Sequence, residues 1–164
     1  TLYCGSFSKT LTPGLRVGWV CASKAAIHQL ELIKQASDLH TPSINQLAIH
    51  HVASRHFDAH VAKIRASYRD RRDAMLAALA RHMPDGVEWT TPEGGMFIWL
   101  TLPKSMDGAD LLAKALKEQK VAFVPGGAFF ADGSGANSLR LSYSCATVET
   151  INDGITRLAR ALGA

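Results

Sequence analysis

The feature that most constrains the fold is a long amphipathic segment from about Phe57 to His82. Apolar residues recur in it at helical spacing, while the other faces carry Arg, Asp and Lys. The apolar positions are Val61, Ile64, Tyr68, Met75, Leu76 and Leu79. Residues 84–86 (Pro-Asp-Gly) end the pattern. At about 1.5 Å per residue, such a helix is long enough to cross a small domain or to bridge two domains.

The residues before this helix predict strands and shorter helices. Thr1–Cys4 is expected to be the end of a strand, and Val17–Ala22 is a continuous apolar run typical of a strand buried on both faces. Ser23 is the expected cap of a following helix, and Pro42 breaks that helix. Ser43 is then expected to cap a separate helix that precedes the long one.

After the long helix the pattern changes to strands alternating with helices. Strands are predicted at residues 87–90, 96–102, 121–124 and 138–143, and helices at 107–119 and 147–162. This order is typical of an α+β layer with helices on one face of a mainly antiparallel sheet. We therefore expect an α/β protein in three parts: a remnant of one domain over 1–55, a connecting helix over 56–83, and a small domain over 84–164.

Composition and charge exclude some functions. The chain has 164 residues and a net charge of +4, and its densest basic stretch, residues 63–72, is interrupted by Asp70. Nucleic-acid binding by this chain is therefore not expected. No apolar run reaches the roughly 20 residues that span a bilayer. Thr1 opens on an apolar segment without a basic leader, so we expect no signal peptide and a natural chain that begins further upstream.

Cysteine usage indicates the compartment. The three cysteines, Cys4, Cys21 and Cys145, are odd in number and match no metal-binding spacing. They lie in or beside apolar segments, which predicts buried free thiols. A reducing, cytoplasmic location fits them best.

The loop GSFSKTLTPGLRVGW, residues 5–19, carries the most specific chemistry. Lys9 lies next to small and apolar groups, and a lysine in a partly dry site becomes available as an amine that forms Schiff bases. Ser6 and Ser8 offer hydroxyl donors, and Arg16 offers a fork of donors for phosphate. The Pro13-Gly14 turn is expected to fold Arg16 back toward the serines. Pyridoxal phosphate needs such a set, although these residues alone also allow a polar loop with an exposed lysine.

Four ordered segments resemble one family. SFSKTLTPGLRVGW resembles the cofactor-lysine segment of the fold-type I pyridoxal-phosphate aminotransferases, class I/II. DLHTPSINQLA resembles the 2-aminoadipate and aromatic aminotransferase subgroup, PEGGMFIWL the first small-domain hairpin, and VAFVPGGAFF with NSLRLSYS the strands that carry the substrate-carboxylate arginine. The resemblance covers essentially the whole chain, which it places in the C-terminal part of that fold.

The resemblance implies a role for each matched residue. Lys9 would form the Schiff base with pyridoxal 5′-phosphate and then move the substrate proton as base and acid. Ser6, Ser8 and Arg16 would bind the cofactor phosphate. Arg140 would hold the α-carboxylate of the substrate in a bidentate pair. By strand alternation Arg140 faces solvent or a polar cleft, and the match favours the cleft.

Several other side chains allow two interpretations. Phe129 and Phe130 either line a substrate pocket or belong to the core. His40 either approaches the site from a neighbouring subunit or satisfies carbonyl groups at a helix end, and the second is favoured. Tyr143 and Trp99 are expected to be core aromatics.

The resemblance also implies what the matched segments do not contain. The family takes the partner of the pyridine nitrogen and other cofactor contacts from earlier in the chain, so these residues alone are expected to have little or no transaminase activity. The implied partners are amino acid and 2-oxo acid substrates and a second copy in a homodimer, with no membrane. Two alternatives stay open: an aminotransferase-like effector domain of a winged-helix regulator, and a non-enzymatic α+β binding module in which Lys9 is incidental.

Overall fold

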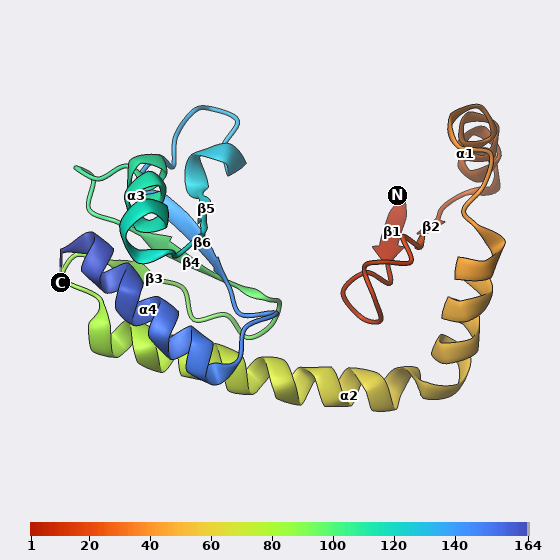
Figure 1. Cartoon of the computed structure of the whole chain (residues 1–164). Helices are drawn as coiled ribbons and strands as arrows, with labels where there is room; N and C mark the ends of the chain where they lie inside the picture. The colour runs from red at the N-terminus through yellow and green to blue at the C-terminus, as the bar shows by residue number, and fades with distance from the viewer. Residues whose placement is uncertain (164) are drawn as a thin grey trace. The chain divides into compact units, whose positions relative to one another are not determined.

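The computed structural model describes residues 1–163. The chain forms two compact units, Thr1–Arg65 and Ala66–Ala164, and helix α2 (Ser43–His82) continues from the first into the second (Figure 1). None of the helices within this described part is both long and apolar enough to cross a membrane.

The first unit contains a β-hairpin followed by helices. Strand β1 (Tyr3–Ser6) pairs antiparallel with β2 (Gly18–Cys21), and helix α1 (Lys24–Ser37) follows. The predicted cap of α1 is confirmed, because the Ser23 hydroxyl oxygen accepts a hydrogen bond of 3.3 Å from the Ala26 backbone N–H. A hydroxyl at this position satisfies one of the backbone donors that a helix leaves free at its start.

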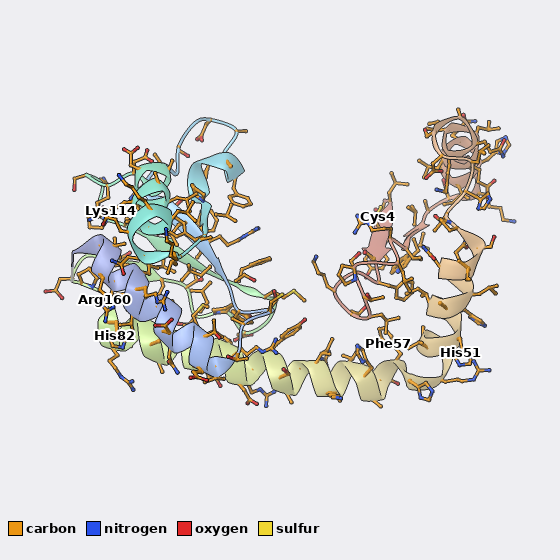
Figure 2. The ribbon with its side chains drawn as sticks, viewed as in Figure 1. Cys4, His51, Phe57, His82, Lys114 and Arg160 are labelled. Carbon is orange, nitrogen blue, oxygen red and sulfur yellow. The ribbon has the colours of Figure 1, made fainter. Side chains whose placement is uncertain are left out.

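The predicted burial of the Val17–Ala22 strand is wrong for this chain. Every residue of β2 is exposed, since within residues 1–163 β1 is its sole partner strand. The prediction of buried thiols fails as well, because Cys4, Cys21 and Cys145 are all free and exposed; Cys4 is labelled on β1 in Figure 2. An apolar run shows that a strand suits burial, but the pattern does not show whether a covering layer is present.

The two helices predicted over residues 43–82 are one continuous helix, α2. Its ribbon bends instead of breaking, and Figure 2 labels His51 and Phe57 on α2 in this region. The Ser54 hydroxyl donates to the His50 carbonyl at 2.7 Å, a contact that bends helices without ending them. No Gly or Pro lies between residues 43 and 82, so no residue there stops the helix.

The second unit is built on a four-stranded antiparallel sheet in the order β3-β4-β6-β5. The strands are Glu88–Trp89, Phe97–Thr101, Ser138–Ser142 and Val124–Pro125 in that order. The strand predicted at residues 121–124 lies slightly later in the chain, at Val124–Pro125. Helix α3 (Gly108–Lys114) passes into a π-helical turn (Ala115–Gln119), a 3₁₀ turn (Gly126–Phe129) follows β5, and α4 (Val148–Leu162) ends the described chain.

The helices cover one face of this sheet, which confirms the predicted layer architecture. Side chains alternate along β4 and β6, so Ile98, Leu100, Leu139 and Leu141 are buried together. They join one core with residues of α3, α4 and the end of α2, among them Leu79, Leu111, Ile155 and Leu158. Tyr143, 1% exposed, also belongs to it, as predicted.

The same alternation places Phe97, Trp99 and Arg140 on the sheet face opposite this core. The prediction that Trp99 is a core aromatic is therefore wrong: it lies outside the buried set and contacts other aromatic rings instead. Apolar character alone did not distinguish the two faces of β4, because both carry large apolar side chains.

Truncating a leucine of this core should destabilise the second unit strongly. Leu79→Ala removes a side chain that is 0% exposed, and we expect a loss of about 2–5 kcal/mol of unfolding free energy. Leu116→Ala is the matched control, since Leu116 is 45% exposed and its truncation should cost well under half as much. Urea unfolding followed by circular dichroism measures both. Equal losses for the two variants would contradict this description of the core.

Candidate functional site

The loop between β1 and β2 carries four of the predicted site residues: Ser6, Ser8, Lys9 and Arg16. The hairpin register pairs Ser6 with Gly18. One step further, the Phe7 backbone N–H donates to the Val17 carbonyl at 3.1 Å. These contacts hold the two ends of the loop side by side, so all four residues belong to one short, closed segment.

Within the loop, Ser8 and Lys9 lie on a single turn. The Leu11 and Thr12 backbone N–H groups both donate to the Phe7 carbonyl, at 2.9 and 3.1 Å. The Ser6 hydroxyl oxygen accepts from the Ser8 backbone N–H at 3.0 Å. A hydroxyl that accepts still has its own O–H to donate, so Ser6 can both fix the turn and donate to an anion.

Arg16 has a left-handed backbone conformation, with φ of 53°. This conformation is costly for a residue other than glycine. Its backbone N–H donates to the Pro13 carbonyl at 3.3 Å, and its Nη1 donates to the same oxygen at 3.2 Å. The Pro13-Gly14 turn therefore does fold the chain back, but the guanidinium is held by Pro13 instead of a serine. The group is exposed and has further donors for a ligand.

Lys9 is exposed. The partly dry environment predicted for its amine is therefore wrong for this chain, because the hairpin carries no covering layer among the described residues. The amine is accessible at the surface of the turn, next to Ser8 in sequence and on the same loop as Arg16.

Three residues that the sequence did not single out shape this loop: Gly5, Trp19 and Asn45. A Cβ at Gly5 would collide with the Trp19 ring, so glycine allows Trp19 to lie over the backbone of β1. Trp19 also contacts Tyr3 edge to face, with ring centroids 5.0 Å apart. The Asn45 side-chain amide donates to the Leu15 carbonyl at 2.9 Å and ties the start of α2 to the loop. Asn45 lies inside the segment DLHTPSINQLA, and the resemblance of that segment to the aminotransferase subgroup was the signal that could have pointed to it.

A second cluster surrounds Arg140 on the sheet face opposite the buried core. Arg140 lies on β6, opposite Trp99 of β4 on one side and Val124 of β5 on the other. Its guanidinium carbon lies 4.0 Å from the centroid of the Phe97 ring and 4.7 Å from that of Phe129. Aromatic faces attract a cation at such distances, so the guanidinium is held between side chains instead of extending freely into solvent.

Phe129 and Phe130 are not core residues, which answers one of the open questions. They are 49% and 42% exposed. Trp99 packs edge to face on Phe129, with centroids 5.5 Å apart, and in a tilted arrangement on Phe130 at 6.0 Å. Gly126 allows the segment that carries these rings to approach the sheet, because a Cβ there would collide with Ser138.

Tyr143 and Arg72 hold the turn that precedes β4. The Tyr143 hydroxyl donates to the Gly94 carbonyl at 3.4 Å, and Arg72 Nη1 donates to the Pro92 carbonyl at 3.2 Å. Burial raises the pKa of Tyr143, and the nearby charge of Arg72 opposes part of this shift. The phenol therefore stays a hydrogen-bond donor at neutral pH, and Phe97 follows directly from a fixed turn.

His40 is the remaining predicted position, and its contact is with the backbone. His40 is exposed, and its Nδ1 lies 2.8 Å from the Thr41 carbonyl, so its contact is with a backbone oxygen. Across residues 1–163, no three His, Cys, Asp or Glu side chains are placed to share a metal ion.

Comparison with known proteins finds one family over nearly the whole chain. The family model described as "Aminotransferase class I and II" matches residues 1–158. A 2-aminoadipate transaminase of Thermus thermophilus is 48% identical over 98% of this chain and 40% of its own length. An aromatic-amino-acid aminotransferase of Thermococcus litoralis is 47% identical over 98% of this chain and 39% of its own length. The chain thus spans about 40% of the length of these relatives.

Solved structures and regulators also match. The crystal structure of LysN, an alpha-aminoadipate aminotransferase of Thermus thermophilus complexed with N-(5′-phosphopyridoxyl)-L-leucine, superposes with a TM-score of 0.95 at 48% identity. The match covers 99% of this chain and 41% of that one. An HTH-type transcriptional regulator of Bacillus subtilis is 37% identical over 96% of this chain and 32% of its own length.

Adding one methyl group at Gly5 should disturb the loop, whereas the same change at Gly14 should not. Gly5→Ala forces Trp19 off the backbone, which should cost about 1–3 kcal/mol of stability and shift the Trp19 indole N–H resonance. At Gly14 the nearest atom to a Cβ is Thr12 Oγ1 at 3.9 Å, so Gly14→Ala is the control. The check is a proton–nitrogen NMR spectrum with urea unfolding of both variants. An unmoved indole resonance in Gly5→Ala would show that the ring does not lie there.

Proposed function

The chain belongs to the class I and II aminotransferase family, and we propose that it forms part of a pyridoxal-phosphate-dependent transaminase. Such an enzyme moves an amino group from an amino acid to a 2-oxo acid. The observation that carries the proposal is the closed loop between β1 and β2, which places an accessible lysine amine, two serine hydroxyls and a guanidinium on one short segment.

The donor set of this loop fits pyridoxal phosphate. Ser6, Ser8 and Arg16 would hold the phosphate group, since hydroxyls donate to its oxygens and a guanidinium matches its charge and geometry. Ser6 is already oriented by the Ser8 backbone N–H, and the Arg16 guanidinium is held on the same loop by its hydrogen bond to the Pro13 carbonyl. Lys9 would hold the aldehyde end through its Nζ atom.

When bound, the cofactor supplies an electron sink that makes the Cα proton of the substrate removable. Lys9 Nζ is the group of this chain that would take this proton from Cα and hold it for return, as a general base and then an acid. Arg140 would orient the substrate through its α-carboxylate, with two parallel hydrogen bonds from the guanidinium. Proton transfer needs an amine that can lose its charge, as at Lys9, whereas carboxylate binding needs a planar cation, as at Arg140.

The substrates follow from the relatives as proposals. The matched transaminases are named for 2-aminoadipate and for aromatic amino acids, so we propose an amino donor of one of these kinds or a branched-chain amino acid, with 2-oxoglutarate as a plausible acceptor. The common part of all these donors is the amino acid backbone, which Lys9 and Arg140 would recognise.

We further propose a cytoplasmic homodimer. Free, exposed cysteines fit a reducing compartment, and the exposed apolar residues of β2 and α1 fit burial in an assembly.

A transcriptional regulator is the second candidate, because an HTH-type regulator is 37% identical over 96% of this chain. Such a protein would use the same cofactor loop to sense an amine or the cofactor. The two candidates differ in turnover, so steady formation of a 2-oxo acid by the full-length protein favours the transaminase. Cofactor binding without turnover, combined with specific DNA binding, favours the regulator.

Removing the Lys9 amine should abolish function in the full-length protein. We expect Lys9→Ala to lose the long-wavelength absorption of the lysine-bound cofactor and to slow turnover by at least about 10²–10⁴-fold. Lys24→Ala is the control, because Lys24 is an exposed lysine at the start of α1. Absorption spectra and 2-oxo acid formation measure the two effects. A Lys9→Ala protein with an unchanged absorption band would rule out this cofactor loop.

A further inference from the structure

We propose that Phe97 and Phe129 are positioning residues for Arg140. Their rings hold the guanidinium and close its Nε off from water, so that a substrate carboxylate is bound end-on by the two Nη atoms. The inference rests on the proposed function in one respect, namely that the ligand of Arg140 is the α-carboxylate of an amino acid.

The contacts of the guanidinium carry the first step. Its carbon lies 4.0 Å from the Phe97 ring centroid and 4.7 Å from the Phe129 centroid. Both values are well within the range of about 6 Å over which a ring face attracts a cation. A planar guanidinium also stacks on aromatic faces, which an ammonium group does not do. Two rings therefore restrict a side chain that would otherwise sample many rotamers.

The fold places these two rings from opposite sides of Arg140. Phe97 lies on β4 opposite Ser142, a diagonal neighbour of Arg140 on the same sheet face. Phe129 ends the 3₁₀ turn after β5, the strand that pairs with β6 on its other edge. Trp99 packs edge to face against Phe129 and keeps that ring in place. The guanidinium is thus bounded by both neighbouring strands.

The Nε atom carries the second step. Within residues 1–163, Arg140 Nε is the buried side-chain nitrogen or oxygen that has no hydrogen-bond partner. A ligand cannot reach an atom that is closed off from solvent. Because the residue as a whole is still partly exposed, the accessible donors are the two Nη atoms at its end. A carboxylate approaching them would be bound end-on, in a single orientation.

The exposure of the rings separates positioning from ordinary packing. Phe97 and Phe129 are 38% and 49% exposed, and neither belongs to the buried core. Replacing either ring by leucine therefore leaves the core side chains in place. Leaving a guanidinium N–H buried and unpaired is unfavourable, and the attraction of the two rings offsets part of that cost.

The geometry can be tested on this chain without any cofactor. In a proton–nitrogen spectrum, the Arg140 Nε–H should exchange slowly with water and show a shift caused by the rings. Phe97→Leu and Phe129→Leu should each speed the exchange and move the resonance. Phe130→Leu is the matched control, because Phe130 has similar exposure and contacts Trp99, but its ring is not among those stacked on the Arg140 guanidinium. A rapidly exchanging Nε–H in the unchanged chain would overturn the inference.

The functional consequence can be tested on the full-length protein, with L-leucine and L-2-aminoadipate as donors. Phe129→Leu should raise KM about three- to tenfold, with kcat changed by less than about twofold, because it weakens ground-state and transition-state binding alike. Phe129→Tyr should restore KM, and Phe130→Leu should leave it unchanged. Inhibition by 4-methylpentanoate, which has the carboxylate, should weaken in Phe129→Leu, whereas inhibition by 3-methylbutylamine, which lacks it, should not.

The outcomes separate this inference from the proposed function. If Arg140→Lys raises KM strongly and Phe129→Leu has no effect, the proposed function stands and the inference is overturned. An equal weakening of both inhibitors by Phe129→Leu also overturns it, because the ring would then act on the whole site. If the unchanged protein shows no lysine-bound cofactor absorption and no turnover, the proposed function fails and with it the α-carboxylate as the ligand of Arg140, whereas the exchange of Nε–H still decides whether the rings hold the guanidinium.

Discussion

The antiparallel pairing of β1 with β2 is the interaction on which the proposed chemistry depends. The register brings Ser6 opposite Gly18 and closes the loop with the bond from Phe7 to Val17. Without that closure, the ends of the loop would not be held together, and the positions of Lys9 and Arg16 relative to each other would vary. The close approach of Trp19 to Gly5 supports the same pairing from the side-chain level. The closed loop therefore carries the Lys9 amine and the Arg16 guanidinium on one segment, where we propose that the cofactor binds.

Strand alternation determines what the second unit can do. The face of β4 and β6 that carries Leu100 and Leu139 is covered by helices and supplies stability. The opposite face carries Phe97 and Arg140, where we propose that the substrate carboxylate binds. Strands β4 and β6 thus place the core on one face and the proposed substrate contacts on the other. Substitutions on the face that carries Phe97 and Arg140 can therefore change binding while the core stays intact.

Much of the fold could be predicted from the sequence, because its signals are local. The cap at Ser23, the helix over residues 147–162 and the buried face of β6 follow from side-chain type and spacing. The errors concern what lies beyond local pattern. The apolar run of β2 suggested burial that no layer among residues 1–163 provides, and a helix boundary was expected near residue 55, where the sequence has no helix-breaking residue.

The candidate site shows the same limit. The residue types of Lys9 and Arg16 indicated their chemistry, but the exposure of Lys9 could not be predicted, since it depends on which other parts of a protein surround the loop. The aromatic contacts of Arg140 were not predicted because they join three segments that are distant in sequence: β4, the turn after β5, and β6. Contacts of this kind depend on strand order, which spacing alone does not determine.

The most direct test of the cofactor loop is to trap its contents chemically. The full-length protein is incubated with pyridoxal phosphate, reduced with borohydride, digested and mapped by mass spectrometry. The account predicts a stable phosphopyridoxyl group on Lys9 and on no other lysine. A group found on another lysine such as Lys24, or no group at all, would contradict it.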